Sequence, residues 1–134
     1  MNKPVPDRIT NAVKELALSV KSRWRVGCVL LRKGRIVVST TNAFGKTHPE
    51  QKRLSILAGQ PHRVSLHAEL RALLKARGPI DTLVVGRISR DGNLCLARPC
   101  PVCQLAISEY GLSRVYYSGS DGSWLEFPTG NKLQ

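Results

Sequence analysis

The chain has 134 residues, of which 42% are hydrophobic, and its 21 Lys and Arg outnumber its 9 Asp and Glu to give a net charge of +12. This length predicts one domain over residues 1–134. No segment approaches the ~20 apolar residues of a membrane span, and the first ten residues, MNKPVPDRIT, lack the apolar stretch of a secretory signal. We therefore expect a cytoplasmic protein with no membrane partner. The excess of basic residues indicates attraction to nucleotides or nucleic acid, with a merely solvated basic surface as the plainer alternative.

The first half of the chain predicts one helix, a hairpin and a long loop. Residues 7–21 carry apolar side chains at helical spacing. Residues 25–42 contain two apolar, β-branched runs joined by Lys33 and Gly34, which is the pattern of a hairpin. Residues 42–64 are polar, basic and interrupted by Pro and Gly, so we expect a long functional or mobile loop with a short helix over 51–59.

The second half alternates helices and strands. We expect a helix over 66–77, a strand over 80–89, a helix over 102–112, a strand over 113–119, and a tail over 121–134 that covers a sheet edge. The order is therefore α-β-β-α-β-α-β. Helices that connect the late strands predict an α/β fold, with a mixed sheet and helices packed on its faces.

Two motifs at successive helix starts contain the residue types of a metal site. His67 and Glu69 lie in the sequence HAE, and Cys100 and Cys103 lie in CPVC. One imidazole and two thiolates supply the three protein ligands of a catalytic zinc site, which leaves one tetrahedral position for water. A helix N-terminus also favours thiolates. Since zinc acidifies its water, a nearby carboxylate such as Glu69 would relay the proton.

Each motif alone has a plainer interpretation. A surface His-x-Glu is commonplace, and CPVC alone is also typical of a redox pair or of half a zinc ribbon. A ribbon needs a second cysteine pair, and Cys28 and Cys95 are not spaced as one. We expect both of these to be small core residues. The joint occurrence of HAE and CPVC at successive helix starts therefore favours a catalytic zinc site.

HAE followed by PCPVC resembles the H-x-E and P-C-x-x-C signature of the zinc-dependent cytidine and deoxycytidylate deaminase superfamily. The resemblance covers most of the chain, from the first helix to the strand that contains VYY. It implies a three-layer α-β-α sandwich with a mixed sheet of about five strands. It also implies that His67, Cys100 and Cys103 hold zinc, that Glu69 is the general acid/base, and that the protein self-associates, with a dimer as the favoured state.

The resemblance extends to candidate substrate contacts. Asn42 resembles the family's Asn that hydrogen-bonds the sugar or base, the alternative being a turn residue after a strand. Ala68 would offer backbone groups to the base, and Phe44 would stack on it. The stretch NAFGKTHP is similar to N-x-x-K-T-H-P in a poorly characterised, phage- and fungus-rich branch. There Lys46 and His48 would meet a phosphate, unless this basic loop is simply solvated.

Arg98 departs from the pattern of many polynucleotide cytosine deaminases, which carry Ser or Thr near the position before Pro-Cys. Its side chain would clamp an anionic substrate or point to solvent. Only 5% of the residues are aromatic, whereas proteins that stack on single strands need several such rings.

Three functions remain, in order of preference. The first is zinc-dependent hydrolytic deamination of a cytosine nucleoside or nucleotide, similar to dCMP, which releases ammonia. The second is deamination of bases in DNA or tRNA, which the net charge favours. The third is a zinc-stabilised nucleic-acid-binding module without catalysis, which would have no need of Glu69. The choice between cytosine and adenine, and the sugar and phosphate of the substrate, stay open.

Overall fold

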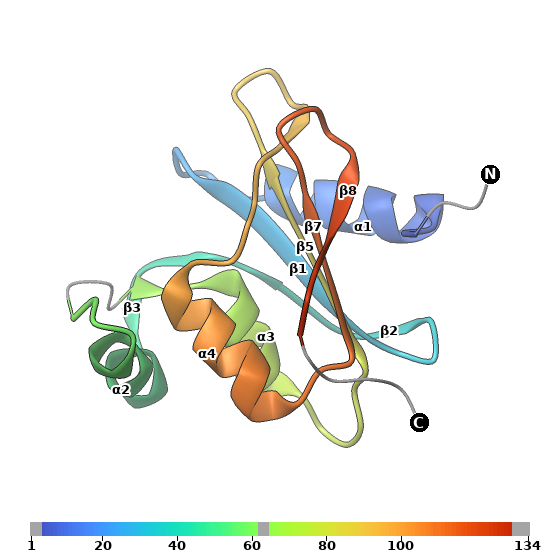
Figure 1. Ribbon diagram of the computed structural model, residues 1–134. Helices are drawn as coiled ribbons and strands as arrows, with labels where there is room; N and C mark the ends of the chain where they lie inside the picture. The colour runs from blue at the N-terminus through green and yellow to red at the C-terminus, as the bar shows by residue number, and fades with distance from the viewer. Residues whose placement is uncertain (1–3, 62–64, 130–134) are drawn as a thin grey trace.

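A mixed sheet forms the centre of the computed structural model, which describes residues 4–61 and 65–129 (Figure 1). Its strands run in the order β2-β1-β5-β7-β8, and β6 pairs with β5 beside this path. The bounds are Arg25–Arg32 for β1, Arg35–Thr41 for β2, Thr82–Ile88 for β5, Leu94–Cys95 for β6, Arg114–Ser118 for β7 and Trp124–Phe127 for β8. The pair β5 and β7 is parallel, and the other pairs of this sheet are antiparallel.

Helices cover both faces of this sheet. Helix α1 (Asp7–Leu18) lies on one face, while α3 (Ala68–Lys75) and α4 (Pro101–Tyr110) pack on the other. Helix α2 (Pro49–Leu57) lies against α4 (Figure 1). A second, two-stranded sheet joins β3 (Ala43–Thr47) to β4 (Ser65–Leu66), and β4 leads directly into α3. The predicted three-layer α/β architecture is confirmed.

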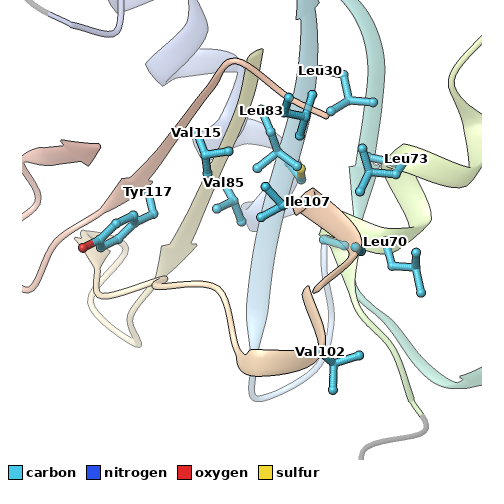
Figure 2. Close-up of a cluster of buried hydrophobic side chains, with 14 of the residues drawn as sticks. Leu30, Leu70, Leu73, Leu83, Val85, Val102, Ile107, Val115 and Tyr117 are labelled. Carbon is cyan, nitrogen blue, oxygen red and sulfur yellow. The ribbon is translucent and has the colours of Figure 1, made fainter. Parts of the chain in front are cut away.

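The layers follow from the two-residue period of the strands. In β1, Cys28 and Leu30 face α3 and α4, whereas Val29 and Leu31 face α1. In β5, Leu83 also points to the larger core, which Figure 2 shows between the sheet and the two helices. Since both faces of β1 and β5 are covered, each of these two strands reads as a nearly continuous hydrophobic run rather than as a strict alternation.

A glycine pair lets α1 approach the sheet closely. Gly27 of β1 lies opposite Gly86 of β5. A Cβ at Gly27 would lie 2.4 Å from the carbonyl oxygen of Val13, and one at Gly86 would lie 2.8 Å from the Val13 Cγ1. The missing side chains therefore create the space that the middle turn of α1 occupies.

The structure differs from the sequence-based expectations in detail. The first helix ends at Leu18, and the expected long loop contains β3 as well as α2, whose bounds lie near the predicted 51–59. The sheet has six strands rather than about five, since β6 is added and the tail pairs with β7 as β8. Within the described ranges, no helix is both long and apolar enough to cross a bilayer.

Of the two cysteines expected in the core, Cys28 is fully buried, as predicted. The prediction for Cys95 is wrong. It is half-buried in β6, where its Sγ accepts a 3.1 Å hydrogen bond from Arg87 Nε. Both residues of the short strand β6 are only half-buried, so the thiol of Cys95 lies beside a polar side chain rather than within the core.

Candidate metal centre and active site

The start of α3 is fixed by bonds to neighbouring elements. His67 is the N-cap residue, with extended backbone angles (φ −78°, ψ 157°), and its carbonyl accepts a 3.0 Å hydrogen bond from Arg71 N. The buried hydroxyl of Thr40 donates a 2.9 Å hydrogen bond to the carbonyl of Ala68. Arg71 Nη1 donates to the Thr41 carbonyl at 3.0 Å. The end of β2 therefore holds the first turn of α3 at Ala68 and at Arg71, both just after His67.

The start of α4 is built in a similar way. Cys100 is the N-cap residue, and Pro101 takes the first helical position, where its missing N–H costs nothing. Gln104 reaches back twice: its backbone N–H donates to the Cys100 carbonyl at 2.9 Å, and its Nε2 donates to the Pro99 carbonyl at 2.8 Å. Cys103 lies one turn into the helix and is fully buried.

His67, Cys100 and Cys103 meet where these two helices begin. The Nδ1 of His67 lies 3.4 Å from Cys100 Sγ and 3.3 Å from Cys103 Sγ. All three ligand atoms lie within 4.8 Å of one another, and no other such group is found in the part of the chain that the structure describes. With Zn–S bonds of about 2.3 Å and Zn–N bonds of about 2.0 Å, tetrahedral ligands lie roughly 3.5–3.8 Å apart. The residues therefore fit a zinc ion.

The two thiols differ in acidity because they share a hydrogen bond. The hydrogen bond with Cys103 lowers the pKa of Cys100 well below its usual value, and His67 contributes to this. The same bond, together with complete burial, raises the pKa of Cys103. One thiolate is thus favoured before a cation arrives, and a bound cation would supply the charge that stabilises the second.

Glu69 lies beside this cluster and is only 7% exposed. Burial raises the pKa of its carboxyl, while the nearby His67 acts in the opposite direction. A carboxyl whose pKa is raised is a stronger base than a carboxyl in water. The side chain therefore has the surroundings of a proton carrier.

The predicted substrate contacts are distributed around this centre. Asn42 follows β2, and its amide binds the chain that enters β1: Oδ1 accepts from Val26 N at 3.0 Å, and Nδ2 donates to the Trp24 carbonyl at 2.9 Å. An amide can make up to four hydrogen bonds, so these two leave capacity for a ligand. Ala68 is buried next to His67, and its carbonyl is already bonded to Thr40.

The remaining predicted contacts lie further along the chain. Phe44 and Lys46 belong to β3, but their side chains lie outside the part that the structure describes. His48 is the N-cap of α2, and its Nδ1 accepts a 3.0 Å hydrogen bond from Glu50 N. Arg98 is exposed, and its guanidinium lies 5.2 Å from the centre of the Phe127 ring.

Sequence reasoning missed Thr40, which holds the first turn of α3. A signal was present, because Thr40 follows Val38 on the face of β2 that packs against the helix. A buried hydroxyl in such a row needs a hydrogen-bond partner. The partner itself could not be identified from the sequence, because it lies 28 positions away.

The family model of the cytidine and deoxycytidylate deaminase zinc-binding region matches residues 7–119. No curated relative matches the chain significantly. The apo crystal structure of the dCMP deaminase from the cyanophage S-TIM5 is similar, with a TM-score of 0.52 and 24% identity over 89% of this chain and 86% of that one. Its complex with dCMP and dUMP gives a TM-score of 0.51 and 24% identity over 90% and 85%.

The likeness to the cyanophage enzyme supports the fold: a mixed sheet with helices on both faces. The family match covers most of the chain and includes both motifs, HAE and PCPVC. The three converging ligand atoms supply the geometry that a zinc-binding region requires. The chain therefore belongs to the family of zinc-dependent cytidine and deoxycytidylate deaminases.

Proposed function

We propose that the protein hydrolytically deaminates a cytosine base carried by a nucleotide similar to dCMP. The observation that carries this proposal is the buried carboxyl of Glu69 beside three converging metal ligands. The family match supports the reaction class. The structurally similar cyanophage enzyme is a dCMP deaminase captured with dCMP and dUMP, which favours a nucleotide as the substrate.

In this proposal, His67, Cys100 and Cys103 hold zinc. When bound, zinc supplies the Lewis acidity that lowers the pKa of water to about 7. The chain itself contributes rigidity, since both cap residues sit at helix starts that are fixed by the hydrogen bonds from Thr40 and Gln104. The same positions expose helix N-termini to the thiolates, which stabilises their charge.

Glu69 moves the protons. Its carboxylate takes a proton from the attacking water, and the protonated carboxyl delivers it to the ring nitrogen next to the amino-bearing carbon. A second transfer brings the other proton of the water to the departing amine. The new C–O bond replaces the broken C–N bond, so cytosine and water become uracil and ammonia. Burial favours the first transfer, because the raised pKa of the carboxyl makes its carboxylate a stronger base toward the attacking water.

Substrate binding is assigned to the residues around the cluster. Asn42 would bind the sugar or base with its remaining hydrogen-bond capacity, and the backbone at Ala68 would bind the base. Arg98 would meet a phosphate, supported by its exposure and by the Phe127 ring beneath it. Phe44 would stack on the base, with Lys46 and His48 at the phosphate side.

The test is a substrate panel. The zinc-loaded protein is incubated with dCMP, dCTP, cytidine, single-stranded DNA and tRNA, and the products are identified by mass spectrometry. We expect dUMP from dCMP. Inosine without uracil would assign adenine as the base instead. No product from any substrate would overturn the proposal and favour a zinc-stabilised nucleic-acid-binding module.

We also propose a cytoplasmic homo-oligomer, with a dimer as the simplest state. All four cysteines are free, which suits a reducing compartment. Ile56 and Leu57 of α2 are 59% and 61% exposed and would be covered by a second copy. Light scattering during size-exclusion chromatography measures the mass, and a monomer at all concentrations would contradict this proposal.

A further inference from the structure

A second site lies outside the metal cluster, in a groove between the chain entering β1 and the turn after β5. It encloses about 520 Å³ and has no acidic residue in its lining. The lining residues are Val20, Lys21, Ser22, Arg23, Arg25 and Arg90. We call this feature the basic groove. Arg25 joins its two sides, because Nη2 of this side chain donates a hydrogen bond to the Ser89 carbonyl.

The positive charge of the basic groove is not neutralised by the protein. Within residues 4–61 and 65–129, no carboxylate lies within ion-pair distance of Lys21, Arg23, Arg25 or Arg90. Asp91 follows Arg90 directly in the chain but forms no ion pair with it. Cationic side chains that line one groove without acidic partners repel one another, so binding of an anionic ligand there is favourable.

An aromatic ring stands in the same segment. Trp24 is 52% exposed, and the guanidinium of Arg87 lies 4.4 Å from the centre of its ring. The Trp24 carbonyl accepts hydrogen bonds from Ser22 Oγ at 2.7 Å and from Asn42 Nδ2 at 2.9 Å. The backbone that carries this large apolar side chain is therefore held in place while much of the ring meets solvent.

The basic groove and the metal cluster lie at the same edge of the sheet. The chain enters β1 at Arg25, β2 ends at Thr41, and β5 ends at Ile88 on this edge (Figure 1). Asn42 binds the Trp24 carbonyl, and two positions earlier Thr40 binds the Ala68 carbonyl beside His67. The hydrogen-bonded segment from Thr40 to Asn42, at the end of β2, thus connects the two sites.

We propose that the basic groove binds the backbone of single-stranded nucleic acid, with a base stacked on Trp24. Four cations spread over one groove exceed what the phosphate of a mononucleotide requires, and a row of phosphates would use them all. Because the chain has few aromatic residues, the cations would provide most of the binding, and Trp24 would add one stacking contact, since every base offers a flat face to an exposed indole.

Binding is tested without chemistry. A fluorescent oligothymidylate of about 12 nucleotides, within the site sizes of single-strand binding folds, carries no amino group that could be removed. Its anisotropy is measured with the zinc-loaded protein between about 50 and 200 mM salt. Four phosphate contacts predict a slope of about −3 in log K against log salt, since each contact contributes about −0.7 for a single strand.

Variants locate the site. Arg23→Glu and Arg90→Glu should each weaken binding about tenfold, and Trp24→Ala should do so as well, whereas Trp24→Phe should retain most of the affinity. The matched control is Arg35→Glu, which makes the same charge change on an exposed residue at the hairpin end of β2. This control should weaken binding less than about twofold.

Three results would overturn the proposal. One is no binding at about 100 mM salt. Another is equal weakening by Arg23→Glu and Arg35→Glu, which would show diffuse attraction only. The third is heparin binding as tight as that of the oligonucleotide with no effect of Trp24→Ala, which would show a general polyanion site. Failure of deamination in the substrate panel leaves these readings unchanged, so the two proposals fail separately.

Discussion

The Thr40 hydroxyl donates a 2.9 Å hydrogen bond to the carbonyl of Ala68, the residue that follows the predicted zinc ligand His67. Thr40 is 3% exposed and belongs to a strand of the central sheet, whereas Ala68 begins a helix. This bond fixes the position of the first turn of α3 relative to the sheet. The position of the imidazole thus depends on a residue that need not touch metal or substrate.

Thr40→Val should test this coupling. The variant keeps the shape of the side chain but removes the donor, so we expect the free energy of unfolding to fall by about 1 kcal/mol. Zinc affinity should fall about tenfold, the low end of the range for groups that orient metal ligands. Urea unfolding and competition with a chromogenic chelator measure the two effects. The exposed Ser39→Ala is the control, and unchanged zinc affinity in Thr40→Val would refute the positioning role.

Glu69→Gln should separate metal binding from proton transfer. The amide is nearly isosteric but cannot carry the proton, so we expect turnover of dCMP to fall by about 10³-fold or more. Zinc content, measured by mass spectrometry, should remain stoichiometric. Glu15→Gln makes the same change on the exposed side of α1 and should retain full activity. A Glu69→Gln enzyme at the wild-type rate would show that Glu69 is not the proton carrier.

The pKa of Glu69 should also be visible in stability. Burial raises the pKa of this carboxyl, so around and above its ordinary value the folded chain binds more protons there than the unfolded chain. The stabilisation that this group contributes is therefore lost as the pH rises from the unfolded pKa through the folded one. In the presence of a chelator, wild type should lose stability relative to Glu69→Gln between about pH 5 and about pH 7.5.

Urea unfolding of the two metal-free proteins at both pH values gives this difference. Other titrating groups are common to both proteins and cancel to first order. A wild type that gains stability relative to Glu69→Gln over this range would show that the carboxylate, not the acid, is the favoured buried form.

Cysteine substitutions should distinguish ligands from bystanders. Cys103→Ser removes a thiol that lies 3.3 Å from the imidazole, so we expect the variant to lose zinc and activity together. Cys95→Ser is the matched control, because Cys95 lies in β6 and contacts Arg87 of β5. This variant should still bind one zinc per chain. Chelation of the wild type should reproduce the loss, and added zinc should reverse it. Full zinc content in Cys103→Ser would rule out its role as a ligand.

The glycine pair under α1 makes a packing prediction. A Cβ at Gly27 would lie 2.4 Å from the Val13 carbonyl oxygen. This oxygen belongs to the backbone of α1, so the clash could be relieved only by moving the helix. Gly27→Ala should therefore lower the free energy of unfolding by about 3 kcal/mol. At Gly59 (φ +72°) a Cβ meets nothing within 4 Å, so Gly59→Ala should cost only the backbone strain of about 1 kcal/mol. Equal losses in the two variants would contradict the close approach.

The sequence predicted the core of the fold because the signals were local. Lys33 and Gly34 marked the hairpin, and the helix expected over 102–112 is α4, which ends at Gly111 in the left-handed conformation. The candidate metal ligands were identifiable for the same reason, since two cysteines separated by two residues at a helix start can reach one ion. The structure then brings His67 within 3.4 Å of Cys100 and within 3.3 Å of Cys103.

Long-range contacts escaped this reasoning. The pairing of β3 with β4 joins short segments with no hydrophobic period of their own. The tail was expected at a sheet edge, and it pairs there with β7 as β8. The bonds of Asn42 to Trp24 and Val26 depend on the register in which β2 pairs with β1, and this register cannot be read from the sequence. The substrate roles of Asn42, Arg98 and His48 therefore stay predictions, whereas the convergence of the ligand set is established by geometry.

Trp124 of β8 lies beyond the matched family region, which ends at residue 119, yet it reaches the first helix. Its indole Nε1 donates a 2.9 Å hydrogen bond to the Thr10 hydroxyl, and its ring lies over Gly86. Translation delivers the N-terminal residues first. During synthesis, α1 can therefore gain this contact only after β8 has been made, more than 100 residues later in the chain.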